Sequence, residues 1–398
     1  MLVEVSTTSR VGQGLRVKSV GKVWLRGGVN VSAVCRVTAL RQLSPAQLDR
    51  WRDLSTASAG ENPFMEADYV VAAAQALPAG GEVQLLSVDG PDGTLLALPV
   101  VRVRGFRRLP VPALSTWVHD YCFLGAPLVR VGHEALAWQV ALRHVARRRE
   151  LPWLLLPDLP ADGLVRQGLS TALQSLGMPT AEVGVHLRAA AFRRPDGTVA
   201  PSGMRGVHVK GLRRQRRRLG EEVGGPVPSL VECTGEPWAV ERFLDLEASG
   251  WKGRTGTAMS SRGRDGDLLR CIAEVWPSRV QIFCLQSADR VLAMQVNLRA
   301  GSSSFCFKTA FDESVRRWAP GTLLETDILR WFADESSLHL LDSCAVAGHE
   351  MAERVLPDRR PLSTVLVPLN AVGHVAAWST PKLMRAALLV RPLPWRSS

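Results

Sequence analysis

Apolar and polar residues change their spacing along this chain in a way that predicts alternating helices and strands. In residues 133–148 apolar side chains recur every three or four positions, as on the buried face of a helix. Two apolar runs, 83–88 and 95–103, flank the turn-forming residues 89–93 and predict a β-hairpin. Residues 153–156 are all apolar, which is typical of a strand buried on both faces. The chain is therefore expected to be an α/β protein.

The order of predicted elements in the first half is repeated in the second half. A second hairpin is predicted over 280–285 and 291–298, about 200 residues after the first. Further helices are expected from Ser44-Pro45 onward and over 66–77, 162–176, 207–222, 236–249, 263–275, 321–334 and 347–355, and further strands over 121–124, 182–192, 228–233, 304–311, 338–341 and 363–367. The repeat predicts two tandem lobes, each with a mixed, mostly antiparallel sheet flanked by helices.

Composition agrees with two globular lobes. The 398 residues are 46% hydrophobic and 22% charged, enough for two ordinary domains. We expect a flexible leader at 1–36, an N-terminal lobe at 37–200, a C-terminal lobe at 201–370 and a tail at 371–398. No apolar run reaches the roughly 18–20 residues of a membrane span, and residues 1–33 lack the apolar core of a secretory signal. The expected location is the cytoplasm.

Charge and cysteine content narrow the classes of partner. The formal net charge of +12 predicts attraction to nucleic acid, phosphorylated cofactors or acidic membranes, although Arg-rich coding in a GC-rich genome gives the same excess. The seven Cys contain no CxxC pair, and the eight His show no paired spacing with Cys or carboxylates. We therefore expect a reducing compartment, no structural disulfide and no metal.

A glycine-rich segment at 250–257 is the first candidate for a binding site. Glycines let backbone N–H groups approach a ligand closely, and the spacing is not that of a Walker A loop. Lys252 and Arg254 would supply positive charge and Trp251 a flat apolar wall. The alternative is the end of a helix followed by an ordinary surface loop.

The predicted strand 304–311 contains a lysine among apolar residues. Strict alternation would place Phe307 and Thr309 on one face and Lys308 on the other. A lysine in an apolar strand needs an anionic partner, so Lys308 either pairs with a structural carboxylate or lies in an active-site cleft. Phe307 and Asp312 would then contact the substrate.

Two further positions could bind or activate a ligand at the edge of the sheet. Pro320, Gly321 and Thr322 begin a helix whose free N–H groups could bind a phosphate, or they form a plain turn. Asp342 ends a short apolar strand, where it could orient or deprotonate an amine or merely cap the next turn. Cys344 is a possible nucleophile without specific support from the sequence.

A basic helix is expected over 207–222. Its arginines form either a solvated face or a site for the phosphates of a cofactor or RNA. They are Arg213, Arg214, Arg216, Arg217 and Arg218.

Four stretches carry a family resemblance. They are Gly250-Trp251-Lys252-Gly253 with Gly256-Thr257-Ala258, then Phe307-Lys308-Thr309-Ala310-Phe311-Asp312, then Pro320-Gly321 with Leu323-Leu324, then Leu341-Asp342-Ser343-Cys344-Ala345. In this order, over about residues 205–367, they resemble the CelD/BcsL-type GNAT acetyltransferases, also described as BioF2-like. The first half is similar in plan, with Asn62-Pro63-Phe64 and residues 123–128 at the expected places.

The resemblance implies tandem GNAT-like lobes, such as also build the Fem-type peptidyltransferases that take amino acids from aminoacyl-tRNA. It implies acyl transfer to an amine or hydroxyl, with some members associated with cellulose or other exopolysaccharide synthesis. The usual GNAT pyrophosphate signature, Gln/Arg-x-x-Gly-x-Gly/Ala, is missing, and only the Pro320-Gly321 turn stands in its place.

The expected function is N-acyl transfer from acetyl-CoA or another acyl-CoA to an amine or hydroxyl of a small molecule or saccharide. In this interpretation Asp342 is the base or orients the amine, and Lys308 binds an anion of substrate or phosphate. The backbone of Gln295, Val296 and Asn297 would hold the carbonyl, and Pro320-Gly321-Thr322 the pyrophosphate.

Two alternatives remain open. One keeps the fold but uses aminoacyl-tRNA, bound by the basic helix, as the donor. The other is a non-catalytic module of a polysaccharide or natural-product pathway, which would have a site packed shut by apolar side chains.

Overall fold

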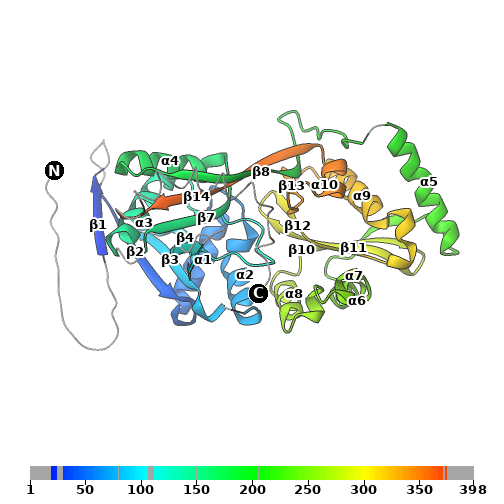
Figure 1. The fold of residues 1–398 in the computed structure, drawn as a ribbon, viewed down its shortest axis with the longest axis horizontal. Coiled ribbons are helices and arrows are strands. Elements are labelled where there is room, and N and C mark those ends of the chain that lie inside the picture. The colour runs from blue at the N-terminus through cyan, green and yellow to red at the C-terminus, as the bar shows by residue number, and fades with distance from the viewer. Residues whose placement is uncertain are drawn as a thin grey trace.

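The computed structural model describes residues 19–24, 30–78, 80–105, 112–148, 151–204, 206–370 and 373, and the predicted tail lies almost entirely outside this range. Two α/β lobes stand side by side and share one long sheet (Figure 1). The predicted fold class is therefore confirmed: each lobe is a mixed sheet flanked by helices. The arrangement places the ends of several strands near the junction of the two lobes.

The first lobe contains a hairpin-based sheet with helices on its faces. Its strands are β1 (Ser19–Trp24), β2 (Asn30–Ala39), β3 (Gln84–Gly90), β4 (Gly93–Val103), β5 (Ala113–Thr116), β6 (Leu128–Val129), β7 (Trp153–Pro160) and β8 (Ala181–Phe192), and its helices are α1 (Pro45–Thr56), α2 (Ala67–Ala76), α3 (Glu134–Arg148) and α4 (Gly163–Leu176). Helix α1 begins where the sequence predicted, because Ser44 and Gln47 form a reciprocal capping box.

The second lobe repeats this plan. Its strands are β9 (Ser229–Glu232), β10 (Val280–Ser287), β11 (Arg290–Ala300), β12 (Ser303–Phe311), β13 (Leu340–Asp342) and β14 (Asp358–Pro368), and its helices are α5 (Gly206–Glu222), α6 (Ala239–Ser249), α7 (Trp251–Arg254), α8 (Asp265–Val275), α9 (Pro320–Asp334) and α10 (Glu350–Val355). Helix α9 covers one face of the β9–β12 sheet and α6 covers the other. The predicted secondary structure of this half agrees closely with the observed elements.

The lobes exchange their last strands. The order across the main path of the described sheet is β1-β2-β3-β4-β5-β7-β14-β8-β13-β12-β11-β10-β9. Strand β14, from the end of the second half, lies between β7 and β8 of the first half, while β8 pairs with β13 of the second. A boundary at residue 200 therefore divides the chain but not the sheet.

Two predictions about the first half are wrong. Residues 121–124 form no strand. Tyr121 lies in a turn, is buried, and donates a hydrogen bond to Asp265 of the second half. The apolar residues around it therefore reflect packing between the lobes. Strand β5 takes the expected place in the sheet instead. The predicted leader 1–36 is also too long, because β2 starts at Asn30 and pairs with β3.

A bulge in β12 changes the predicted faces of that strand. Val296 of β11 is opposite Lys308, but Asn297 is opposite Cys306, which leaves Phe307 as the extra residue. Past the bulge, Lys308 lies opposite Val296 and Thr309 opposite Gln295. Phe307 and Lys308 therefore share a face, and the assignment of Thr309 to the face of Phe307 is wrong.

The strand exchange predicts that neither half folds alone. A chain of residues 1–200 would lack β14 between β7 and β8, and a chain of 201–398 would lack β8 beside β13. Expressed separately, each half should show no cooperative unfolding transition by circular dichroism, whereas the two co-expressed halves should copurify and melt together. A cooperative transition of residues 201–398 alone would contradict this.

Candidate functional site

A cavity opens where two parallel strands of the second lobe part. Ser303–Phe305 of β12 pair with Leu340–Asp342 of β13, and the two segments then diverge. The gap holds a cavity of about 400 Å³. Its wall includes Asp120, Glu247, Trp251, Lys252, Cys306, Phe307, Lys308, Thr309, Glu313, Gly321, Glu325, Ser343 and Cys344. Residues from four separate segments of the second half thus meet a loop of the first half.

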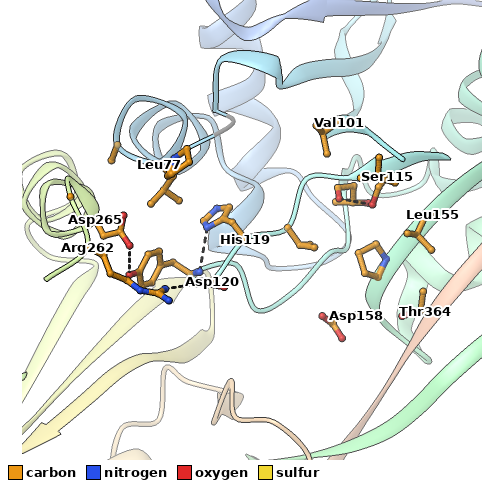
Figure 2. A pocket seen from close by; sticks show the side chains of 18 of the residues that line it. Leu77, Val101, Ser115, His119, Asp120, Leu155, Asp158, Arg262, Asp265 and Thr364 are labelled. Atoms are coloured by element: carbon orange, nitrogen blue, oxygen red, sulfur yellow. Dashed lines mark hydrogen bonds and ion pairs between the residues drawn. The ribbon is translucent and has the colours of Figure 1, made fainter. Parts of the chain in front are cut away.

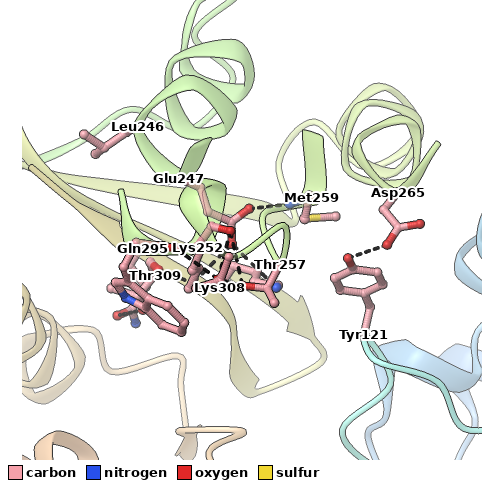
Figure 3. Close-up of polar contacts among 12 residues, drawn as sticks. Tyr121, Leu246, Glu247, Lys252, Thr257, Met259, Asp265, Gln295, Lys308 and Thr309 are labelled. Carbon is pink, nitrogen blue, oxygen red and sulfur yellow. Dashed lines mark hydrogen bonds and ion pairs between the residues drawn. The ribbon is translucent and has the colours of Figure 1, made fainter. Parts of the chain in front are cut away.

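On the α6 side of the cavity, two lysines share one buried carboxylate (Figure 3). Lys252 Nζ lies 3.1 Å and Lys308 Nζ 3.5 Å from Glu247 Oε1. Lys252 also donates to the Thr309 carbonyl at 2.8 Å, and the Met259 N–H donates to Glu247 Oε2 at 2.8 Å. Lys308 Nζ stands 4.8 Å from the centre of the Tyr121 ring, a cation–π contact across the lobes.

Burial and charge oppose each other in this cluster. Burial works to raise the pKa of Glu247, but Lys308 and Lys252 outweigh it and hold that pKa below its usual value. Burial lowers the pKa of Lys308, and the Glu247 carboxylate only partly compensates. Lys308 is thus a desolvated cation at the wall of the cavity, while Glu247 stays ionised.

Glu325 is the second unusual carboxylate of the cavity. It lies on α9, is 3% exposed, and burial raises its pKa to about 7, against the opposing effect of a hydrogen bond from Gln295. The other carboxylates at the wall have cationic partners: Glu247 with the lysines, Asp120 with Arg262 and Glu313 with Arg254. Glu325 therefore exchanges its proton near neutral pH.

The predicted carbonyl-binding backbone of β11 is not available. Gln295, Val296 and Asn297 are fully buried, and β11 is paired on both edges by β10 and β12. The side chains of Gln295 and Asn297 instead form part of a polar chain: Thr309 donates to Gln295 at 3.1 Å, and Gln295 donates to Asn297 at 3.0 Å. Gln295 of this chain also hydrogen-bonds Glu325. The prediction that the β11 backbone contacts the donor carbonyl is therefore corrected.

Asp342 does not have the environment of a base. It is fully buried, its Oδ2 accepts from Arg360 at 2.7 Å, and its Oδ1 accepts from the Cys344 N–H at 2.8 Å and lies 3.7 Å from Arg188. Burial works to raise its pKa, but Arg188 and Arg360 outweigh burial and hold the pKa below its usual value. Asp342 is a structural anion outside the cavity wall. Cys344 lines the cavity, but burial raises the pKa of its thiol, which disfavours a nucleophile.

The structure brings together some of the predicted substrate residues and separates others. Trp251, Lys252 and Phe307 line the cavity with Lys308. Arg254 is exposed and pairs with Glu313, whose other oxygen accepts from the Trp251 N–H at 2.6 Å. Asp312 caps a turn by accepting from Ser314 and pairs with Arg290, so it holds the chain after β12 and does not reach the cavity.

The predicted phosphate-binding turn lies at the cavity rim. Helix α9 starts at Pro320, and Ala319 before it has φ 51° and gives no side-chain cap to the first turn. Gly321 lines the cavity, whereas Pro320 is buried beside it and Thr322 accepts from Thr326 through its carbonyl. The uncapped N–H groups of this turn leave a positive helix end beside the gap.

Helix α5 presents most of its arginines to solvent. Arg216 turns inward to Asp327 at 2.6 Å, while Arg217 and Arg218 lie within ion-pair distance of Glu221. Arg213 and Arg214 are exposed on the same helix. The helix projects at the end of the second lobe (Figure 1).

No helix in the part of the chain that the structure describes is both long and apolar enough to cross a membrane. Nor do His, Cys, Asp and Glu side chains gather there in a group of three that could hold a metal ion.

The fold defines the class of protein: it has two GNAT-like lobes, with a cavity where two parallel strands part. L-PGS from Bacillus licheniformis has a similar structure, with 13% identity, a TM-score of 0.51, and coverage of 85% of this chain and 96% of that one. So does the C-terminal domain of a putative lysylphosphatidylglycerol synthetase from Agrobacterium fabrum, with 12% identity, a TM-score of 0.50, and coverage of 87% and 98%.

The sequence match is narrower. Residues 207–350 match the family model of the acetyltransferase (GNAT) domain. This range contains the cavity residues of α6, α7, β12 and α9. No curated protein matches the chain significantly.

Sequence reasoning missed Glu247, Glu325, Asp120 and Tyr121. Glu325 carried a usable signal, because it falls among the apolar positions of the helix 320–334 and one turn after Gly321. Glu247 likewise falls on the apolar face of α6. An acidic residue on a buried helix face requires a partner or a shifted pKa, and both residues have one.

Replacing Asp342 by Asn should destabilise the protein by roughly 3 kcal/mol, because Arg188 and Arg360 would stay buried without their anion. Asp334→Asn, at the exposed end of α9, is the matched control and should change the free energy of unfolding by less than about 0.5 kcal/mol. Since the folded pKa of Asp342 is depressed, its contribution is present above the unfolded pKa and is lost as pH falls below about 4. Urea unfolding at pH 7 and pH 3 measures both effects; equal stability of the two variants at pH 7 would refute the assignment.

Proposed function

We propose that the chain is a cytosolic acyltransferase of the GNAT type that moves an acyl group from a thioester, with acyl-CoA as the donor, to an amine. The observation that carries the proposal is the joint presence of Glu325 and Lys308 at one cavity where β12 and β13 part. Glu325 exchanges a proton near neutral pH, and Lys308 offers a desolvated positive charge. The match of residues 207–350 to the GNAT domain supports it.

The residues suggest a division of roles. The amine nitrogen forms a bond to the thioester carbon, and the Lys308 ammonium stabilises the negative charge on the carbonyl oxygen. The ammonium product of attack gives its proton to Glu325, directly or through one water. The C–S bond then breaks, and the proton passes to the leaving thiolate, so that the base returns to its starting state. Glu247 keeps Lys252 and Lys308 in place and takes no proton.

The gap and the helix end suggest how the donor lies. A pyrophosphate bound at the uncapped turn of Gly321 and Thr322 would direct the rest of the donor molecule along α9 toward the gap between β12 and β13. The unpaired Phe307 of the bulge lies at the same wall, where a backbone group freed from the ladder suits a carbonyl partner. The CelD/BcsL-type resemblance favours the same donor. The charged lining of the cavity disfavours a non-catalytic module with a closed site.

A second donor, aminoacyl-tRNA, is favoured by one observation. The exposed arginines of α5 form a basic face on the second lobe, which suits a polyanion. The two donors share the chemistry at Glu325 and Lys308 and differ only in what holds the carrier.

Glu325→Gln should lower kcat about a hundredfold or more, since it removes the proton acceptor.

The Glu325→Gln change should also raise the free energy of unfolding at pH 8. Burial raises the Glu325 pKa from 4.5 to about 7, so ionisation costs folding free energy as pH rises through that window. The gain should approach roughly 3 kcal/mol above pH 7 and vanish below pH 4.5.

Turnover against pH and urea unfolding at pH 5 and pH 8 check the two parts. The rate should rise with an apparent pKa near 7 in the unaltered protein. Glu335→Gln, beyond the end of α9, is the control and should leave the rate unchanged. Full activity of the Glu325→Gln variant would remove Glu325 from the mechanism.

The donor is tested by thermal unfolding with CoA, acetyl-CoA, longer acyl-CoAs or bulk tRNA. A ligand that binds the folded state at 100 times its Kd adds about 2.7 kcal/mol, a shift of several degrees. We expect stabilisation by an acyl-CoA that is unaffected by the double variant Arg214→Gln, Arg217→Gln. A salt-sensitive shift with tRNA alone, abolished by that variant, would make aminoacyl-tRNA the donor.

A further inference from the structure

A second cavity, of about 980 Å³, opens in the first lobe (Figure 2). Strand β5 pairs in parallel with β7 from Ala113 to Ser115 opposite Trp153 to Leu155, and the strands then part. The cavity lies at that parting, the position that the acyl-transfer cavity occupies between β12 and β13. Its volume is that of a pocket for a whole small molecule. The duplicated fold thus provides two clefts of the same origin.

The far end of this cavity holds two polar side chains, those of Thr116 and Asp158. Thr116 is 1% exposed, and its hydroxyl meets no hydrogen-bond partner in the described part of the chain. Asp158 has φ 47° and lies where the pairing of β7 with β14 shifts its register. Among the described residues its carboxylate has one ionic neighbour, His186 Nε2 at 3.8 Å, which is too far for a hydrogen bond. A buried hydroxyl without a partner and a partly exposed carboxylate on a strained backbone, both at one cavity wall, point to a ligand.

The near end of the cavity adjoins the acyl-transfer site. Asp120 lines both cavities and pairs with Arg262, and Tyr121, which contacts Lys308, donates to Asp265 at 2.6 Å. Between the two ends the wall is largely apolar. It includes Leu77, Pro78, Val101, Val103, Val118, Leu155 and Pro157.

The first-lobe cleft is unsuited to a phosphorylated carrier. Its crossover helix, α3, begins at Glu134, whose carboxylate accepts from the Gly132 N–H at 3.0 Å just before the helix, and neither residue lines the cavity. A phosphate there would meet a negative charge, whereas the corresponding end of α9 carries no side-chain cap. Arg262 and Arg264 also line the cavity, but they pair with Asp120 and Asp267, so the Asp158 carboxylate favours a cationic ligand.

We infer that the 980 Å³ cavity binds the acyl acceptor, and that the acceptor is a diamine with an apolar middle. One ammonium group binds Asp158 and the Thr116 hydroxyl at the far end. The other amine lies at Asp120 and passes to the carbonyl beside Lys308, where it is acylated. This inference rests on the proposed acyl transfer for the second step only; the binding of the diamine does not depend on it.

Calorimetry without any donor tests whether the cavity binds a diamine. The probe is hexamethylenediamine, and the comparison ligand is hexylamine, which has the same apolar chain but lacks the second amine. Asp158→Asn should weaken diamine binding about tenfold and remove most of the preference for the diamine over hexylamine. The control is Asp162→Asn, an exposed carboxylate before α4, which should change neither. Equal diamine affinity in the unaltered protein and the Asp158→Asn variant would overturn the assignment of Asp158.

Thr116→Val separates a ligand contact from a structural role. Since no described residue hydrogen-bonds this hydroxyl, its replacement by a methyl group should leave the melting temperature unchanged or raised, while diamine affinity falls several-fold. A lowered melting temperature with unchanged affinity would overturn the role of Thr116. Diamine binding that both variants weaken, without acylation of the diamine by any donor, would retain the cavity assignment and contradict the proposed function.

Discussion

The buried ion triad of Asp342, Arg188 and Arg360 holds the junction on which the rest of the structure depends. The three residues come from β13, β8 and β14, the strands through which the lobes are joined. Burial of these charges is tolerable only when all three strands are in register, because any slip leaves a charge without its counterion. Arg188 also donates to the Phe123 carbonyl at 2.7 Å, so the triad fixes a loop of the first lobe at the cavity of the second.

This constraint explains why local sequence patterns identified most elements but not their assembly. The helix at 134–148 and the hairpin of β10 and β11 follow from apolar periodicity, which packing preserves. The placement of β14 between β7 and β8 leaves no local trace, since an apolar strand pairs equally well with several partners. The bulge at Phe307 is a single inserted position, and one residue suffices to invert the faces of a strand. Lys308 was found from its cost of burial, while its orientation required the register.

The same reasoning separates what could be predicted of the site from what could not. Lys252, Lys308 and Trp251 were recognisable because charged and aromatic residues stood out in glycine-rich or apolar surroundings. Asp342 stood out equally, but a strand-end carboxylate has the same sequence pattern whether it faces substrate or two arginines. Glu325 lay within a helix whose apolar face was expected to be core. A shifted pKa arises from distant neighbours in space, so it was visible only after folding.

Burial gives the cavity its chemistry at the expense of stability. Glu325 titrates near 7 because α9 and the sheet remove it from water, and Lys308 loses basicity by the same desolvation. A surface glutamate would be more favourable for folding but would be fully ionised and a weak base at neutral pH. The polar chain through Gln295 and Asn297 limits this cost, since each buried amide in it has a partner. Continuous pairing across the exchanged strands supplies the rigidity that keeps Glu325 in its unfavourably buried position. The chemistry of the site therefore depends on the shared sheet.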